Sequence, residues 1–164
     1  MMSDWYDKDY SDHMNAEYAR IRAKHPKLVT VHFECNAGWY PIIERYFDGV
    51  AELLEKHPGA TFRASQIKEK LGGIRLYSDG SPVLCEPVGK LVREAEIEAD
   101  RTCEVCGAAG ALRVIGVGFY ATRCDTHAEG GQLATWQEPT EIAVPGIEAR
   151  VRIHIPAKKD EDDG

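Results

Sequence analysis

The stretch CEVCGAAGALRVIGVGFYATRCDTH, residues 103–127, is the part of the chain that most strongly constrains the fold. It contains two short pairs of metal-binding residues, Cys103 with Cys106 and Cys124 with His127, separated by a linker of seventeen residues. Two such pairs at this spacing are the signature of a tetrahedral structural zinc site. Four protein ligands leave no open position for a substrate, so the pattern predicts one structural zinc ion and a scaffold rather than an active site.

The residues around the ligands refine this prediction. Gly107 follows the first pair, where a tight turn needs permissive backbone angles. Two short strands over residues 112–117 and 119–123 are expected next, and a helical turn over 125–129 ends at Gly130. This order of knuckle, hairpin and helix start resembles the treble-clef class of zinc finger. The alternative is a set of scattered buried cysteines, which two correctly spaced pairs argue against.

Length and composition indicate one compact domain. The chain has 164 residues, of which 43% are hydrophobic and 29% charged, as in an ordinary globular protein. No apolar run approaches membrane-spanning length, and residues 1–13 lack the apolar core of a signal peptide. The odd number of cysteines, five, fits a metal site that uses three of them better than a full disulfide framework. We therefore expect a cytoplasmic protein.

The net charge of -7 and the pI of about 5.4 argue against a general affinity for nucleic acid. Neutralising phosphates supplies most non-specific binding to nucleic acid, and an acidic chain cannot provide it globally. Three thiolates with one divalent ion add only about -1 to this balance. Any contact with nucleic acid would have to come from a local basic patch.

The predicted organisation has three parts: an acidic amino-terminal arm over residues 1–14, a single domain over 15–156, and a charged, disordered tail over 157–164. The domain contains the zinc module at about residues 101–133. We expect a carboxyl-terminal pair of strands over 141–143 and 147–155 to complete it.

Two helices and two smaller elements are expected before the zinc module. A short helix over 15–24 and a strand over 28–33 come first. A strong helix follows with Pro41 in its first turn, and His57-Pro58-Gly59 ends it. A second helix is predicted over 83–101. Both long helices carry apolar residues at helical spacing: Ile43, Tyr46, Phe47, Val50, Leu53 and Leu54 in the first, and Leu84, Val88, Leu91, Val92, Ala95 and Ala99 in the second.

A β-hairpin is predicted between the two helices, with Gly72-Gly73 as its two-residue turn. This turn pairs Leu71 with Ile74 and Lys70 with Arg75, and it places a core face opposite a basic face. The core face carries Ile67, Leu71, Ile74 and Leu76, and the basic face carries Lys68, Lys70, Arg75 and Tyr77. Together with the helices, this hairpin predicts an α+β fold: two helices on a small antiparallel sheet, with a treble-clef-like zinc module in the carboxyl-terminal half.

The basic hairpin face is a candidate binding site, because like charges placed opposite each other are unfavourable unless an anion lies over them. The simpler interpretation is a solvated outer face. A second basic edge is formed by Arg150, Arg152 and His154, and its simpler interpretation is protection of an edge strand against aggregation.

The sequence gives weaker support to the hypothesis that the protein is an enzyme. His32 and Glu34 form an H-x-E, and Cys103-x-x-Cys106 follows, so the parts of a zinc deaminase signature are present. Thr102 stands where that family has proline, the separation is long, and two ligands would be left without a role. A His-metal finger nuclease is equally disfavoured, because His127 is already used as a ligand. Cys35 and Cys85 are single; a lone cysteine is more often a small buried hydrophobe than a nucleophile, although a Cys–His pair stays open.

Three segments together resemble a known group of sequences: FECNAGWY (residues 33–40), QIKEKLGGIRLY (66–77) and the ligand stretch through Ala128. The arrangement is similar to uncharacterised small proteins encoded in bacteriophages, prophages and neighbouring bacterial genes. This resemblance implies a bacterial or infected-host cytoplasm and a host-directed or anti-defence role. An acidic surface suits that role, since it can compete with nucleic acid for basic partners.

The sequence therefore favours a non-catalytic, zinc-stabilised interaction protein whose partner is a protein of the bacterial host. Two alternatives stay open. One is a nucleic-acid-binding finger protein that uses Lys68, Lys70 and Arg75. The other is a zinc-dependent hydrolase or deaminase that uses His32 and Glu34.

Overall fold

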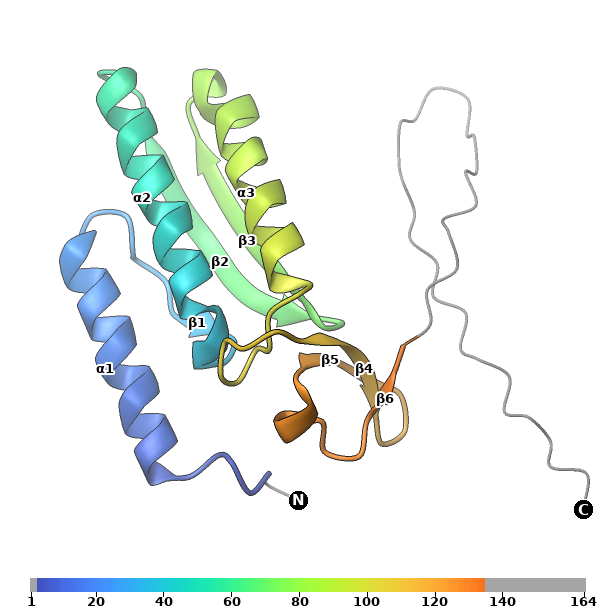
Figure 1. Cartoon of the computed structure of the whole chain (residues 1–164). Coiled ribbons are helices and arrows are strands. Elements are labelled where there is room, and N and C mark those ends of the chain that lie inside the picture. Colours follow the sequence, from blue (N-terminus) through green and yellow to red (C-terminus); the bar gives the residue numbers. More distant parts are fainter. Residues whose placement is uncertain (1–2, 135–164) are drawn as a thin grey trace, which may run out of the picture.

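The structure is a computed structural model that describes residues 3–134 (Figure 1). Within these residues it is an α+β fold, as predicted, and each of the three helices expected from the sequence is present. The helices are α1 (Lys8–Lys24), α2 (Tyr40–Lys56) and α3 (Cys85–Ala99). The strands are β1 (Phe33–Glu34), β2 (Phe62–Lys70), β3 (Gly73–Gly80), β4 (Ala111–Ile115), β5 (Phe119–Arg123) and β6 (Gln132–Leu133), and short 3-10 turns span Ala37–Trp39, Pro82–Leu84 and Asp125–His127.

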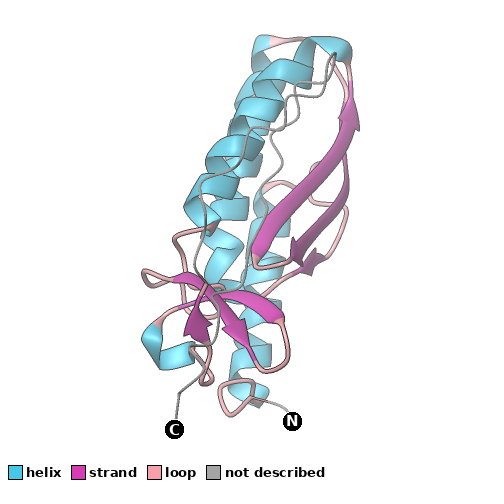
Figure 2. Ribbon diagram, turned by 90° about the vertical axis from the view of Figure 1, so that its right-hand side faces the viewer, coloured by secondary structure: helices cyan, strands magenta, loops and turns pink. Residues whose placement is uncertain are grey.

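Two small sheets are present in the described part of the chain. The first has the order β1-β2-β3, in which β1 runs parallel to β2 and β3 antiparallel to it. The second has the order β5-β4-β6 and is antiparallel. Helices α2 and α3 lie on one face of the first sheet, and no described element covers its other face (Figure 2). The second sheet lies beyond the carboxyl-terminal end of α3 (Figure 1).

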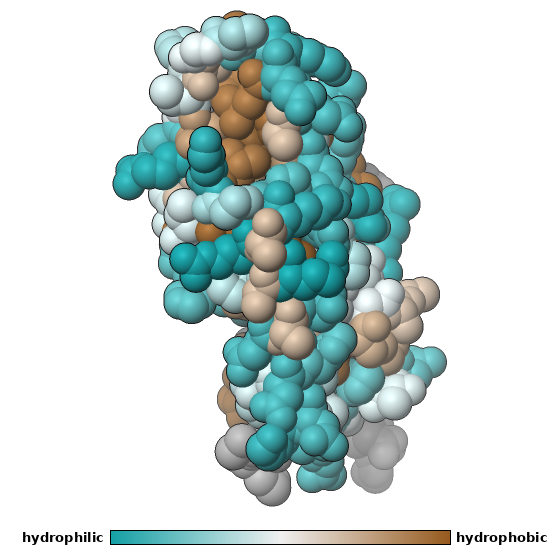
Figure 3. Space-filling view, turned by 90° about the vertical axis from the view of Figure 1, so that its left-hand side faces the viewer, coloured by the Kyte–Doolittle hydropathy of each residue, from teal (hydrophilic) through white to brown (hydrophobic). Residues whose placement is uncertain are grey.

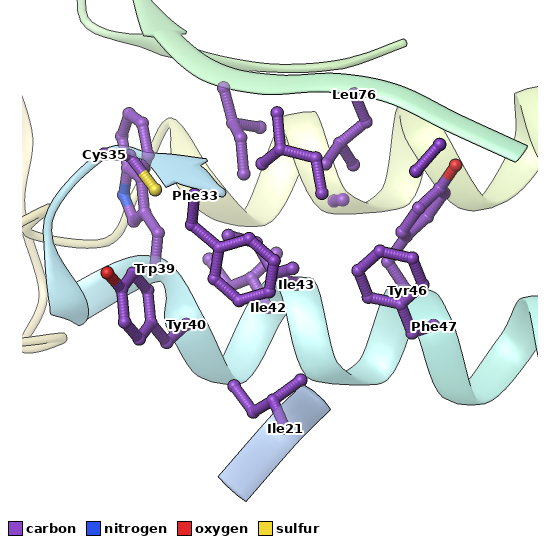
Figure 4. Packing of buried hydrophobic residues seen from close by; sticks show 14 of the residues in the cluster. Ile21, Phe33, Cys35, Trp39, Tyr40, Ile42, Ile43, Tyr46, Phe47 and Leu76 are labelled. Carbon is purple, nitrogen blue, oxygen red and sulfur yellow. The ribbon is translucent and has the colours of Figure 1, made fainter. Parts of the chain in front are cut away.

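The core lies between the first sheet and α2, with α1 on the outer side of α2 (Figure 4). Phe33, Ile43 and Phe47 are buried at its centre, and Ile21 of α1 is fully buried against α2. Burying an aromatic or aliphatic side chain of this size contributes about 1.5–3 kcal/mol. The apolar stripes predicted for α2 and α3 therefore place both helices correctly.

The predicted start of the first helix was wrong. Residues 8–14 are helical, so the predicted helix over 15–24 extends back to Lys8, and the proposed arm shrinks to the residues before it. Asp7 begins the helix as its N-cap, because its side chain accepts a hydrogen bond from the backbone N–H of Tyr10. The acidic residues of this segment that suggested a loose arm are helix-capping and solvent-exposed residues.

The strand predicted over 28–33 is also shorter than expected, because only Phe33 pairs within a sheet and continues into Glu34. The preceding residues form turns after α1. The backbone N–H groups of Leu28 and Val29 both donate to the carbonyl of His25. Backbone groups satisfied locally in this way leave none for a ladder, although Val29 is as buried as a strand residue would be.

The hairpin forms, but its register is shifted from the prediction. Its two turn residues are Leu71 and Gly72, with φ of 52° and 78°, and Lys70 pairs with Gly73. Positive φ at both positions is the geometry of a type I′ turn, whose backbone twist matches that of the flanking strands. Consequently Lys68, not Lys70, lies opposite Arg75, and Leu71 is 67% exposed rather than part of the core face.

The carboxyl-terminal strands predicted over 141–143 and 147–155, the basic edge of Arg150, Arg152 and His154, and the tail over 157–164 lie outside the described residues. Within residues 3–134, no helix is both long enough and apolar enough to cross a membrane. From the side of α1, the surface is mostly hydrophilic, with one apolar area near the end away from the second sheet (Figure 3).

Candidate metal centre

The four predicted ligands lie close together between the second sheet and residues 3–100, which we call the amino-terminal body. Cys103 and Cys106 come from the loop after α3, Cys124 follows β5, and His127 ends the 3-10 turn Asp125–His127. Their ligand atoms all lie within 4.8 Å of one another. We refer to residues 101–133, which carry them, as the Cys/His module.

The spacing of the ligand atoms fits a tetrahedral site. The Sγ atoms of Cys106 and Cys124 are 3.7 Å apart, and Nδ1 of His127 lies 3.2 Å from Sγ of Cys124 and 3.8 Å from Sγ of Cys103. A tetrahedron with metal–sulfur bonds of about 2.3 Å has edges of about 3.8 Å. The four residues can therefore hold one metal ion with little movement.

Local backbone geometry explains why the first pair converges. Gly107 has a φ of 78°, and its N–H donates to the carbonyl of Cys103 over 2.9 Å. The N–H of Cys103 donates in turn to the carbonyl of Ala108 over 2.7 Å. This tight loop brings both sulfurs to one side, and it needs the left-handed angle that glycine adopts without strain. The prediction made for Gly107 is confirmed.

The thiols of the cluster differ in acidity. Burial, together with hydrogen bonds to neighbouring thiols, raises the pKa of Cys106 to about 11. Burial also acts to raise the pKa of Cys124, but hydrogen bonds with His127 outweigh it and lower that pKa to about 6. Cys124 is therefore the most readily ionised of these two thiols, and a metal ion binds thiolates rather than thiols.

Gly38 is the point where the Cys/His module meets the amino-terminal body most closely. Its N–H donates to the carbonyl of Glu104 over 2.7 Å. A side-chain carbon at this position would lie less than 3.0 Å from the carbonyl oxygens of Cys103 and Glu104, both inside the metal-binding knuckle. The neighbouring Trp39 is fully buried, and its indole N–H donates to the carbonyl of Thr102 over 2.9 Å. The knuckle is thus packed directly against the start of α2.

Glu104, between the first two ligands, is buried rather than solvated. Its Oε1 accepts hydrogen bonds from the backbone N–H and the side-chain amide of Asn36, each over 3.0 Å. Its Oε2 lies 3.9 Å from the guanidinium of Arg123, which is also buried. Burial raises the pKa of Glu104, while Arg123 and Asn36 oppose that rise. This ion pair and its hydrogen bonds form a polar link between the module and the body.

The amino-terminal segment covers the same junction from the other side. The hydroxyl of Tyr10 donates to the carbonyl of Val105 over 2.8 Å and accepts from the N–H of Ala37 over 3.0 Å. The indole of Trp5 lies edge-on to His127, with ring centroids 6.1 Å apart, and 5.0 Å from the guanidinium of Arg123. A cavity of about 280 Å³ remains between these residues and the ligands.

The predicted binding residues Lys68, Lys70, Arg75 and Tyr77 share the sheet face that the helices leave uncovered, as the register of β2 and β3 requires. The ammonium of Lys68 lies 6.0 Å from the ring centroid of Tyr77. Glu34 and Gln66 belong to this face too, and the amide of Gln66 donates to the carboxylate of Glu34. The face is therefore mixed in charge rather than uniformly basic.

The histidine and the glutamate of the deaminase hypothesis lie outside the ligand cluster, which contains only its two cysteines. His32 stacks on Tyr18 with ring centroids 5.3 Å apart, and Glu34 lies on the uncovered sheet face. The two single cysteines also lie outside it: Cys35 is buried, and burial raises its pKa well above that of a free thiol, whereas Cys85 is exposed. Within residues 3–134, the four predicted ligands form the one group spaced to hold a metal ion.

Several residues that build this centre were not predicted. Glu104 reads as a surface charge, and Tyr10 and Trp5 fall in the segment expected to be a loose arm. Gly38 and Trp39 lie in the stretch FECNAGWY, for which the sequence predicted no contact with the ligands. No pattern in the sequence indicates that Asn36 pairs with Glu104, 68 positions away, or Tyr10 with Val105, 95 positions away.

No family model, curated protein or solved structure matches this chain.

Proposed function

We propose that the chain is a non-catalytic, zinc-stabilised interaction protein that binds a protein of the bacterial host. Zinc is the ion that a tetrahedral set of three thiolates and one imidazole suits best. All four positions of such an ion would be filled by Cys103, Cys106, Cys124 and His127, so none remains for a substrate or water. The role of the metal is then to hold the knuckle against the body.

One observation supports this proposal above the others: the knuckle that carries the buried ligand Cys103 is packed directly against the amino-terminal body. Gly38 leaves no room between the start of α2 and the knuckle, and Tyr10 and Glu104 bond across the junction. Catalytic metals keep one side open to a substrate, whereas structural metals join chain segments. The acidic net charge and the phage-like sequence pattern support a host-directed or anti-defence role.

The first test compares the purified wild type with Cys124→Ser and with Cys85→Ser as a matched control. We expect one zinc per chain in the wild type, and loss of both zinc and cooperative thermal unfolding in Cys124→Ser. Cys85 is exposed and outside the cluster, so Cys85→Ser should keep both properties. A Cys124→Ser protein that retains its metal and its fold would refute the structural role.

The second test addresses the partner. The zinc-loaded wild type is used to capture proteins from a bacterial lysate, and a captured protein is then purified and titrated. We expect a complex of defined stoichiometry and no consumption of substrate. Turnover of a nucleoside or ester substrate that requires Glu34 would favour the hydrolase alternative.

A nucleic-acid-binding function is the second candidate, and the shared face of Lys68, Lys70 and Arg75 favours it. It predicts binding that weakens steeply with salt and with replacement of these three residues by alanine. Glu34 on the same face opposes it, because a carboxylate repels phosphate. Titration of single- and double-stranded oligonucleotides at two salt concentrations distinguishes the candidates.

A further inference from the structure

Strand β3 leaves one of its two edges unpaired among the described residues. It is the last strand in the order β1-β2-β3 (Figure 1), and its eight residues span Gly73–Gly80. Unpaired strand edges of this length present a row of backbone donors and acceptors to any partner strand. Natural proteins commonly block such edges, and β3 carries no proline or bulge that would do so.

The register of the hairpin fixes which backbone groups face this edge. Because Lys70 and Gly73 flank a two-residue turn, they form a hydrogen-bonded pair, and residues on β3 alternate from there. Gly73, Arg75 and Tyr77 therefore direct their N–H and C=O groups toward β2, whereas Ile74, Leu76 and Ser78 direct theirs outward. In agreement with this, the carbonyl of Ile74 accepts a hydrogen bond from the side chain of Arg75 over 2.8 Å.

An apolar groove of about 440 Å³ runs beside the same edge, between β3 and α3. Its lining includes the apolar side chains of Leu76, Leu84, Val88 and Val92, together with Gly89 of α3. Residues of β3 and α3 line this groove, and β3 is the strand of the first sheet on the side that Figure 2 turns toward the viewer.

The side chains on the outer face of β3 are complementary to themselves. Arg75, Tyr77 and Asp79 occupy alternate positions with Tyr77 in the middle. If a second β3 lies antiparallel with Tyr77 opposite Tyr77, then Arg75 of each copy lies opposite Asp79 of the other. Leu76 then faces Ser78, and these are residues whose backbone groups point outward. This symmetric register thus pairs opposite charges, places the two tyrosine rings side by side, and lets the outward backbone groups hydrogen-bond.

We propose that the chain forms a homodimer in which two copies of β3 pair antiparallel about a two-fold axis at Tyr77, joining the two three-stranded sheets into one. The axis is perpendicular to the sheet, so the helices of both copies lie on the same side and their grooves face each other. In the dimer the side chain of Arg75 gives up its hydrogen bond to the carbonyl of Ile74 and pairs with Asp79 of the second copy. The uncovered faces of the two sheets, each with Lys68 and Lys70, become one wider face.

Charge reversal tests this pairing in the full, zinc-loaded chain. Molar mass is measured by light scattering and sedimentation over a range of protein concentrations, and we expect a dimer. Arg75→Glu and Asp79→Arg each place like charges opposite one another twice, so each should weaken the dimer about tenfold or more. The double variant Arg75→Glu/Asp79→Arg restores the opposite charges and should restore the dimer. Arg63→Ala is the control, since it removes only the internal partner of Asp79.

A cross-link tests the register independently. Residues at a non-hydrogen-bonded antiparallel pair have Cα atoms about 4.5 Å apart, within the range of a disulfide. Tyr77→Cys in a Cys85→Ser background should therefore give a covalent dimer on mild oxidation, and Lys68→Cys in the same background should not. Circular dichroism and zinc content confirm that each variant is folded.

The proposal is overturned if the wild type is a monomer at every concentration, which would leave the edge for another strand of this chain or for a different protein. It is also overturned if a dimer survives both single charge reversals, since its interface would then lie elsewhere. A dimer that the single variants weaken and the double variant restores supports it.

Discussion

At the scale of single residues, Gly38 has the strongest consequences for this structure. It lies in the 3-10 turn that leads into α2, where this turn and the knuckle come into backbone contact, and its N–H donates to the carbonyl of Glu104. A methyl group there would overlap two carbonyl oxygens of the knuckle, neither of which can move without displacing a ligand. Glycine is needed here for close approach and not for an unusual backbone angle.

Replacing Gly38 by alanine should therefore destabilise the protein by about 3 kcal/mol or more, at the upper end of the range for overpacking. It should also weaken metal retention, because the added methyl group would overlap the backbone carbonyl of Cys103, which is one of the predicted ligands. Chemical unfolding and metal content measure both effects. Gly89→Ala is the matched control: Gly89 lies in α3, and an added side-chain carbon there would meet only the flexible end of Arg93, at 3.4 Å, so alanine should stabilise that helix by about 0.5–1 kcal/mol. Equal effects of the two substitutions would contradict the argument.

At the scale of elements, the β2–β3 turn shows a conflict between a residue and its conformation. Leu71 has a φ of 52° and is 67% exposed, whereas asparagine and glycine are the residues that suit this position in a type I′ turn. The turn also contacts the Cys/His module, because the hydroxyl of Thr122 donates to the carbonyl of Gly72 over 2.6 Å.

Leu71→Asn should stabilise the protein by about 1 kcal/mol, because asparagine adopts positive φ at less cost and an exposed apolar side chain is removed. Leu71→Val provides the contrast, since a β-branched residue resists this angle and should destabilise the turn. Thermal unfolding of the three proteins gives the order. A valine variant as stable as the asparagine variant would show that the turn is not of this type in solution.

The contact between α1 and α2 depends on charge as well as burial. Glu44 of α2 accepts hydrogen bonds from Arg20 and Lys24 of α1, and the guanidinium of Arg20 is the main reason that its pKa falls to about 2. A carboxyl group whose pKa is lower in the folded state binds protons less readily there than in the unfolded chain. Its contribution to stability is therefore complete above its ordinary pKa of about 4.5 and lost as the pH falls toward 2.

Comparison of the wild type with Glu44→Gln isolates this effect from the protonation of the metal ligands, which both proteins share. Above pH 5 the variant should be less stable by on the order of 1 kcal/mol, the usual size for partly exposed ion pairs. The difference should shrink between about pH 4.5 and pH 2. Denaturant unfolding at a series of pH values measures it, and a difference that is constant with pH would exclude an ionic origin.

At the scale of the whole molecule, the Cys/His module and the amino-terminal body share one interior. Several contacts join them, among them the knuckle with Gly38, the hydroxyl of Tyr10 with Val105, and Thr122 with the hairpin turn. The indole of Trp39 also crosses the junction to Thr102. Parts joined in this way are expected to unfold together rather than one after the other.

Removal of the metal with a strong chelator should therefore lower the stability of the body as well as of the module, by several kcal/mol. In a Trp5→Phe/Trp136→Phe variant the fluorescence comes from Trp39, which is buried in the body, while far-ultraviolet circular dichroism follows the helices. We expect the two signals to change together in one transition at a lower temperature. If Trp39 fluorescence and helical signal keep their original transition after the metal is removed, the module and the body are independent.

The sequence by itself determined the ligand set, the two long helices and the existence of the hairpin. Each of these depends on residues close together in the chain: the spacing of Cys103 and Cys106, the apolar period of α2, and a glycine between two strand-forming runs. Short-range patterns record such features because neighbouring residues create them.

Only the tertiary structure decided how these elements meet. It showed that α1 begins at Lys8, that the turn is Leu71-Gly72, and that Glu104 is buried. Each outcome depends on a partner far away in the sequence or on the geometry of twisted strands, and one sequence carries no record of such pairs. The pairing of Asn36 with Glu104 and of Tyr10 with Val105 arises only when packing brings the knuckle against α2 and satisfies the polar groups buried there.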